Sequence, residues 1–127
     1  MNPHVEFPEW LRAQLTQSCI QPVFAAIFGS VGRKSPNPND CDLLLVLERP
    51  TNQIDWRPIA AEKKGIRTRF LDTWRISLSI TILTLAEAGE DTAFVRTVFR
   101  RELIPIIGSL DLLFSTLRER GLVGWLA

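Results

Sequence analysis

The chain has 127 residues and a formal net charge of +1, from 15 Lys and Arg against 14 Asp and Glu. Hydrophobic residues make up 46% of the chain and charged residues 23%, which is the balance of a globular protein and excludes a disordered one. A net charge so close to zero argues against a protein that coats nucleic acid, although a local nucleic-acid contact stays open. The length predicts one domain over residues 1–127.

The composition also bears on the compartment. No apolar run approaches the ~18 residues that a membrane span needs, so we expect no membrane contact. The first ten residues, MNPHVEFPEW, lack a basic stretch followed by an apolar one, so we expect no signal peptide. Two cysteines, Cys19 and Cys41, are too few for a disulfide scaffold, and we expect a cytoplasmic protein.

The first predicted element is a helix, followed by a strand. Pro8 suits a first helical turn, and apolar residues follow it at near-helical spacing: Trp10, Leu11 and Leu15. Residues 21–28 (QPVFAAIF) form a compact apolar run that ends at Gly29. Such a run, bounded by Pro and Gly, predicts a buried strand.

The middle of the chain predicts a loop, a strand and a helix. Residues 35–40 (SPNPND) predict a loop, because their two prolines lack N–H groups and push the preceding residues out of the helical region. Residues 43–47 (LLLVL) predict a second strand. Residues 56–74 carry an apolar stripe at helical spacing, which predicts a helix that Gly65 could interrupt.

A third strand is the clearest of the predicted elements. In residues 76–83 (ISLSITIL), apolar and polar side chains alternate, so that Ser77, Ser79 and Thr81 share one face. Thr84 with Glu87 three residues later is the pattern of a capping box and predicts a short helix.

Two further helices are expected near the end of the chain. Asp91 is predicted to cap a helix that ends before Pro105, and residues 110–119 predict a last helix with Gly121 at its end. The four tryptophans are expected to be core or interface residues, and Trp125, in an apolar tail that needs cover, is the first candidate among them to meet a partner. The order of elements predicts a small α/β or α+β domain.

One segment is markedly basic. Residues 51–75 hold six basic residues against three acidic ones. The basic residues are Arg57, Lys63, Lys64, Arg67, Arg69 and Arg75. A solvated helix face and a surface that attracts phosphates or an acidic partner both fit this pattern.

Residues 25–47 contain the candidate chemistry. A buried strand ends at Gly29–Ser30, and the next strand begins with Asp40 and Asp42, whose i, i+2 spacing puts both carboxylates on one face. Two such close negative charges favour a cation between them, and oxygen ligands of this kind suit Mg²⁺. Glycine lets a backbone approach a phosphate, and the Ser30 hydroxyl can bind phosphate oxygens. The alternative is that both aspartates are ordinary turn and edge-strand residues.

These residues resemble a known family. Gly29–Ser30, Arg33 three residues later and Asp40-x-Asp42 at the start of a strand look like the signature of the DNA polymerase β-type nucleotidyltransferase superfamily. The small size suggests its minimal nucleotidyltransferase (MNT) branch. The resemblance covers the two strands and the loop between them closely, and extends more loosely to residues 94–108. It implies an α+β fold with a short mixed β-sheet flanked by helices.

The resemblance also implies roles for these residues. Gly29 and Ser30 would hold the triphosphate of a nucleotide, and Arg33 would neutralise phosphate charge or brace the loop. Asp40 and Asp42 would be the catalytic pair and would bind one or two Mg²⁺ ions. The implied reaction is Mg²⁺-dependent transfer of a nucleotide monophosphate, with AMP from ATP expected, to an unknown acceptor.

The sequence departs from the family pattern in its third carboxylate. Active members usually carry an acidic residue on the next strand, where residues 76–83 offer only serine and threonine on the polar face. Asp72 and Glu87 are the candidates to replace it, although Glu87 also fits a helix cap. Lys34 stands where relatives often have glycine.

That departure leaves two further readings open. One is a weakly active or inactive MNT-type antitoxin that pairs with a HEPN-like toxin, and the other is a nucleotide sensor. A homo-oligomer also stays open.

Overall fold

The computed structural model describes residues 2–35, 38–122 and 124–125 of the chain. Four strands form one mixed sheet in the order β3-β2-β1-β4. They are β1 (Phe24–Phe28), β2 (Asp40–Leu47), β3 (Ser77–Thr84) and β4 (Ile104–Ile107). β1 runs antiparallel to β2 and to β4, whereas β2 and β3 are parallel. The predicted α+β fold with a short mixed sheet is therefore confirmed.

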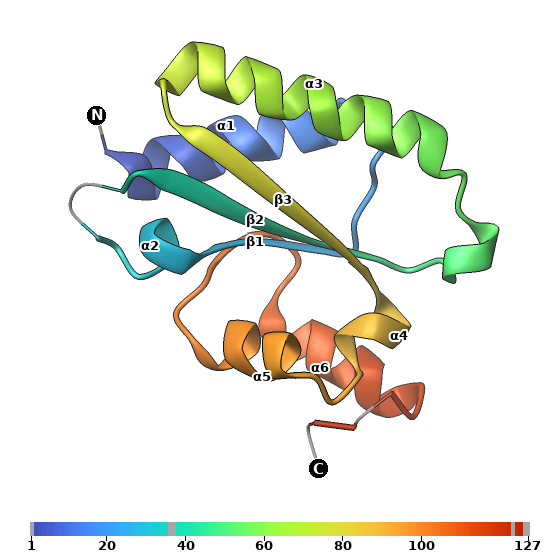
Figure 1. Ribbon diagram of the computed structural model, residues 1–127. Helices are drawn as coiled ribbons and strands as arrows, with labels where there is room; N and C mark the ends of the chain where they lie inside the picture. Colours follow the sequence, from blue (N-terminus) through green and yellow to red (C-terminus); the bar gives the residue numbers. More distant parts are fainter. Residues whose placement is uncertain (1, 36–37, 123, 126–127) are drawn as a thin grey trace.

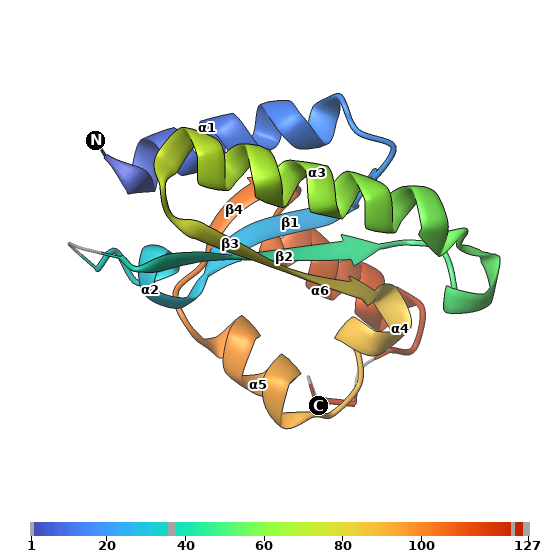
Figure 2. The same ribbon diagram turned by 45° about the horizontal axis from the view of Figure 1, so that its top comes forward.

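Helices cover both faces of the sheet (Figure 1). On one face lie α1 (Pro3–Thr16) and α3 (Trp56–Trp74), which run side by side in both ribbon views (Figures 1 and 2). On the other face lie α4 (Leu85–Ala88), α5 (Ala93–Arg100) and α6 (Leu110–Glu119). A short helix, α2 (Gly29–Gly32), follows β1, and a 3₁₀ turn, η1 (Thr51–Gln53), precedes α3.

Each face of the sheet has its own apolar core, because side chains alternate along every strand. Beneath α1 and α3, the core is formed by Phe7, Leu11, Cys41, Leu43, Leu45, Ile66 and Phe70. Against α4, α5 and α6, it is formed by Phe24, Ala26, Leu44, Val46, Val98, Phe99 and Leu117. The central strands β1 and β2 contribute to both cores, which explains why their sequences are apolar almost throughout.

The N-terminal helix begins earlier than the sequence predicts. Asn2 caps α1 by accepting a hydrogen bond from the backbone N–H of His4, and Pro3 occupies the first turn. Pro8 lies inside the helix and is buried, so its assignment to a first turn is wrong. It has no N–H to give to the carbonyl of His4, a loss that burial in the core offsets.

The long helix α3 runs without a break through Gly65. It begins at the predicted residue and ends at Trp74, where Arg75 adopts the left-handed conformation at φ 59°. This helix supplies the crossover that two parallel neighbours such as β2 and β3 require. The side chain of Arg67 also reaches the sheet, where its Nε donates to the carbonyl of Leu78 on edge strand β3 at 3.1 Å.

The segment after α4 differs most from the sequence prediction. α5 is capped by Thr92, whose hydroxyl accepts from the N–H of Val95 at 3.2 Å, whereas the predicted cap, Asp91, forms an ion pair with Arg96. The sequence analysis also does not predict the strand β4, which contains Pro105. Proline is tolerated there because β4 lies at an edge of the sheet.

The C-terminal segment folds back onto the protein. α6 ends as predicted, with Gly121 in the left-handed region at φ 71°. Trp125 is only 9% exposed, stacks on Phe99 with ring centroids 5.3 Å apart, and donates its indole N–H to the carbonyl of Ala88 at 2.7 Å. Of the two roles expected for Trp125, the structure shows the core role, because the chain's own side chains cover it.

No helix within the described ranges combines the length and the apolar character needed to cross a membrane. Cys19 is exposed and Cys41 is buried, and both are free thiols.

Candidate functional site

The structure brings Gly29 into contact with Asp42. Gly29 follows the last residue of β1 and turns the chain into α2 with φ at 71°, a conformation that favours glycine. A Cβ atom at this position would lie 2.2 Å from Oδ2 of Asp42. The backbone conformation therefore favours glycine, and any larger residue would have to displace this carboxylate.

Ser30 and Asp40 lie at the same place. The Ser30 hydroxyl lies 3.5 Å from both Oδ1 and the backbone carbonyl of Asp40, so it donates at most a long hydrogen bond to either. Four of the five residues predicted for the site thus adjoin one another at the start of β2. The structure leaves the Ser30 hydroxyl weakly engaged, and it remains available to another acceptor.

The two aspartates share one face of the sheet, as their spacing predicts. Cys41 between them is fully buried in the core beneath α1 and α3, so the carboxylates point to the opposite face. Burial, together with the charges of the two aspartates, raises the pKa of the Cys41 thiol to about 12. The thiol is therefore an inert core group and takes no part in the site.

Arg33 caps the C-terminal end of α2 and is exposed. Its backbone N–H donates to the carbonyl of Gly29 at 2.9 Å, which closes the turn around the glycine. Burial and the negative charge of Asp40 raise the pKa of Asp42, and the positive charge of Arg33 lowers it by a smaller amount, so the net shift is upward. Lys34, which follows, adopts φ 59°, the conformation for which glycine is the usual residue.

The strand next to the aspartates carries no acidic group. In the parallel register, Ser77 pairs with Asp40, Ser79 with Asp42 and Thr81 with Leu44. The polar face of β3 therefore lies beside the two carboxylates, as the alternating pattern predicts, and it offers hydroxyl groups only.

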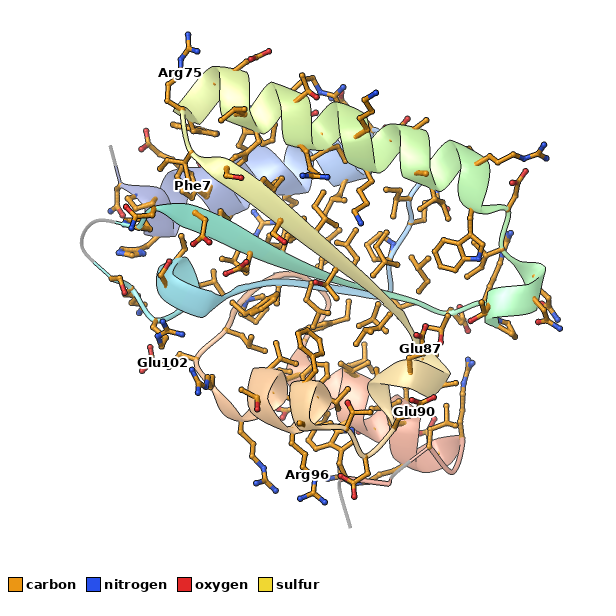
Figure 3. The ribbon with its side chains drawn as sticks, in the orientation of Figure 1. Phe7, Arg75, Glu87, Glu90, Arg96 and Glu102 are labelled. Carbon is orange, nitrogen blue, oxygen red and sulfur yellow. The ribbon has the colours of Figure 1, made fainter. Side chains whose placement is uncertain are left out.

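Neither proposed substitute for the third acid reaches the site. Asp72 is exposed on α3, which covers the opposite face of the sheet. Glu87 completes the capping box with Thr84 and lies at the α4 end of the sheet, away from α2 (Figure 3). Within residues 2–35, 38–122 and 124–125, no group of three or more His, Cys, Asp or Glu side chains could hold a metal ion.

The two carboxylates nonetheless suit a divalent cation that is also held by phosphate oxygens. Mg²⁺ is usually bound by one or two carboxylates together with substrate phosphates. Asp42 is half-buried, and burial together with the negative charge of Asp40 raises its pKa. A cation bound by Asp40 and Asp42 would offset both effects, so the residues present fit Mg²⁺.

A cavity of about 370 Å³ lies elsewhere, lined among others by Leu47, Glu48, Ile54 and Ile59. Leu47 ends the strand that Asp40 begins, so this cavity and the aspartates lie at opposite ends of β2. With a rise of about 3.3 Å per residue, the two places are on the order of 20 Å apart. The cavity is not part of the candidate site.

One pair of aromatic residues beside the site was not predicted from the sequence. Phe28 pairs with Asp42 across β1 and β2, and its ring packs against that of Phe94 from α5. The position of Phe28 directly before Gly29 was a usable signal. Phe94 gave none, because it falls in an amphipathic helix whose other large apolar residues, Val95, Val98 and Phe99, are core residues.

The comparisons with known proteins bear on the fold. No family model matches the chain, and no curated protein matches it. Among solved structures, the chain is similar to one described as "Crystal structure of the toxin-antitoxin with AMP-PNP", with a TM-score of 0.55 and 9% sequence identity. The match covers 90% of this chain and 86% of that chain. The fold is therefore shared with a chain of a toxin–antitoxin structure.

Proposed function

We propose that this protein is a Mg²⁺-dependent nucleotidyltransferase of the MNT type that transfers AMP from ATP. The observation that carries the proposal is the contact between Gly29 and the Asp42 carboxylate, with Asp40 and Ser30 beside it. The shared fold adds support, since the similar structure contains AMP-PNP, a nucleotide.

Each residue of the site has a defined task in this proposal. Asp40 and Asp42 hold Mg²⁺ through their carboxylate oxygens, and Asp42 does so in its ionised form. Ser30 donates its weakly engaged hydroxyl to a phosphate oxygen, and Arg33 attracts the phosphates by its positive charge. Gly29 keeps the turn narrow enough for Asp42 to stay beside the phosphates. When bound, the metal ion stabilises negative charge on the transferred phosphoryl group and on the leaving pyrophosphate.

The missing acid on β3 sets the expected rate. The hydroxyls of Ser77 and Ser79 cannot take the proton of an attacking hydroxyl as a carboxylate would, because an alcohol is a far weaker base. General base catalysis typically contributes about 10²–10⁴-fold. We therefore expect turnover slower by about that factor than in a site with three acids.

The same feature favours a second candidate function. A site that binds nucleotide with two carboxylates but transfers slowly suits a protein that acts by binding, such as an antitoxin that pairs with a HEPN-like toxin. The similar structure is described as a toxin–antitoxin, which supports a role with a protein partner.

The test measures binding and turnover separately. ATP binding is measured by titration calorimetry with and without Mg²⁺, and transfer is measured as pyrophosphate release. The Asp40→Asn, Asp42→Asn double variant is expected to lose Mg²⁺-dependent binding. Asp72→Asn is the matched control, because it removes an exposed carboxylate from the opposite face and leaves binding intact.

The outcomes separate the two candidates. Binding with pyrophosphate release supports the transferase. Binding without release, together with a stable complex with a helical partner protein, supports the antitoxin. Equal ATP binding by the wild type and the double variant would refute both.

A further inference from the structure

Two aromatic rings beside the candidate site have no task in the proposed chemistry. Phe28 is the last residue of β1, and Phe94 lies in the first turn of α5. Their ring centroids are 6.0 Å apart and their planes are inclined by 81°, so the edge of one ring meets the face of the other. They form an aromatic pair, which we call the Phe28–Phe94 pair.

The register of the sheet places this pair next to the aspartates. Phe28 is the direct antiparallel partner of Asp42, and directly paired residues have Cα atoms about 4.5–5.5 Å apart. Their side chains stand on the same face of the sheet. Phe28 also directly precedes Gly29, which packs on the Asp42 carboxylate. The pair is therefore adjacent to the atoms proposed to hold phosphate and metal.

The exposure of Phe94 distinguishes it from its neighbours. Val95, Val98 and Phe99 of the same helix are at most 7% exposed, whereas Phe94 is 41% exposed. The exposed part of the Phe94 ring is an apolar surface that a planar ligand can cover, and covering it is favourable.

We propose that the Phe28–Phe94 pair binds the base of the nucleotide, with the base stacked on the exposed surface of Phe94. This inference rests on the proposed function, since it presumes that the phosphates lie at Gly29, Ser30 and the two aspartates. Stacking on an aromatic side chain is tolerant of base identity. We therefore expect adenine and guanine nucleotides to bind with similar affinity, and both to bind more tightly than pyrimidine nucleotides, whose rings cover less surface.

The test uses two ligands that differ by the nucleoside. Dissociation constants of Mg·ATP and of Mg·tripolyphosphate, which has the phosphates but no base, are measured for the wild type and for Phe94→Ala. We expect Phe94→Ala to weaken ATP binding about thirtyfold, the middle of the range for loss of one base–aromatic stack, and to leave tripolyphosphate binding unchanged. Phe94→Trp, which keeps a stacking surface, should bind ATP as the wild type does.

A matched control removes a similar apolar side chain elsewhere. Leu112 of α6 is 62% exposed, and Leu112→Ala should change neither constant. Equal ATP affinity in the wild type and Phe94→Ala would overturn the inference, and so would an equal loss for both ligands. If neither ligand binds to the wild type, the proposed function itself fails and the inference falls with it.

Discussion

Replacing Gly29 by alanine tests whether the turn and the carboxylate depend on each other. The new Cβ would lie 2.2 Å from Oδ2 of Asp42, closer than any real contact, so the carboxylate must move. The backbone must also keep φ near 71°, which an L residue rarely adopts. We expect Gly29→Ala to lose Mg²⁺-dependent ATP binding and some stability.

A second glycine separates these two effects. Gly121 has the same φ of 71°, but among the residues that the structure describes no heavy atom lies within 4 Å of a Cβ built there. In both alanine variants the left-handed backbone conformation should destabilise the folded protein by about 1–2 kcal/mol. The substitution also lowers the conformational entropy of the unfolded chain, which stabilises the folded protein by about 0.4–1 kcal/mol. We therefore expect Gly121→Ala to lower the free energy of unfolding by about 1 kcal/mol. Gly29→Ala should lose more, since it adds the displacement of Asp42.

The assay pairs thermal unfolding with ATP titration on both variants. A loss near 1 kcal/mol corresponds to a midpoint shift on the order of 4 °C in a thermal scan of a protein of this size. Gly121→Ala should bind Mg·ATP as the wild type does. The reasoning is refuted if Gly29→Ala binds ATP normally, or if both variants lose binding to the same extent.

Three further predictions concern Asp42, the chain terminus and a helix cap. Burial raises the pKa of Asp42 above its ordinary 3.8, so the ionised carboxylate destabilises the folded protein at pH values above the raised pKa. Asp42→Asn should therefore increase the unfolding midpoint at pH 7. This gain should shrink as the pH falls toward 3.8 and vanish below it, where Asp42 is protonated in both the folded and the unfolded chain. Trp125→Ala removes the stack on Phe99 and the hydrogen bond to Ala88, and should cost about 3 kcal/mol in urea unfolding; a loss below 1 kcal/mol would show that the tail does not pack as described. Thr84→Ala should cost about 1 kcal/mol through its cap, measured in the same way, and an unchanged stability would contradict that role.

The sequence predicts the parts of the fold that have a local signal. The alternation in residues 76–83 requires a strand with Ser77 and Ser79 on one face, and the parallel register places both beside the aspartates. The spacing of Thr84 and Glu87 identifies the capping box, because both hydrogen bonds form within three residues of the chain. The arrangement of Asp40 and Asp42 follows from strand geometry alone.

Other features depend on contacts between distant parts of the chain. β4 forms because β1 offers a free edge for it to pair with. In the sequence, Pro105 is typical of the end of a helix and does not predict a strand. Trp125 is an apolar residue near the end of the chain, and only the three-dimensional structure shows that Phe99 and Ala88 cover it. The contact between Gly29 of α2 and Asp42 of β2 likewise depends on how the turn after β1 lies against β2, and in the sequence only the family resemblance groups the two residues.

The two edges of the sheet bear on how the protein stays in solution. At β3, the guanidinium of Arg67 already occupies the carbonyl of Leu78, and at β4, Pro105 has no N–H to offer an incoming strand. Unprotected edges allow chains to add to one another and aggregate, and both features oppose such growth. A strand of another molecule that approached these edges would meet an acceptor already in use at Leu78 of β3 and a missing donor at Pro105 of β4.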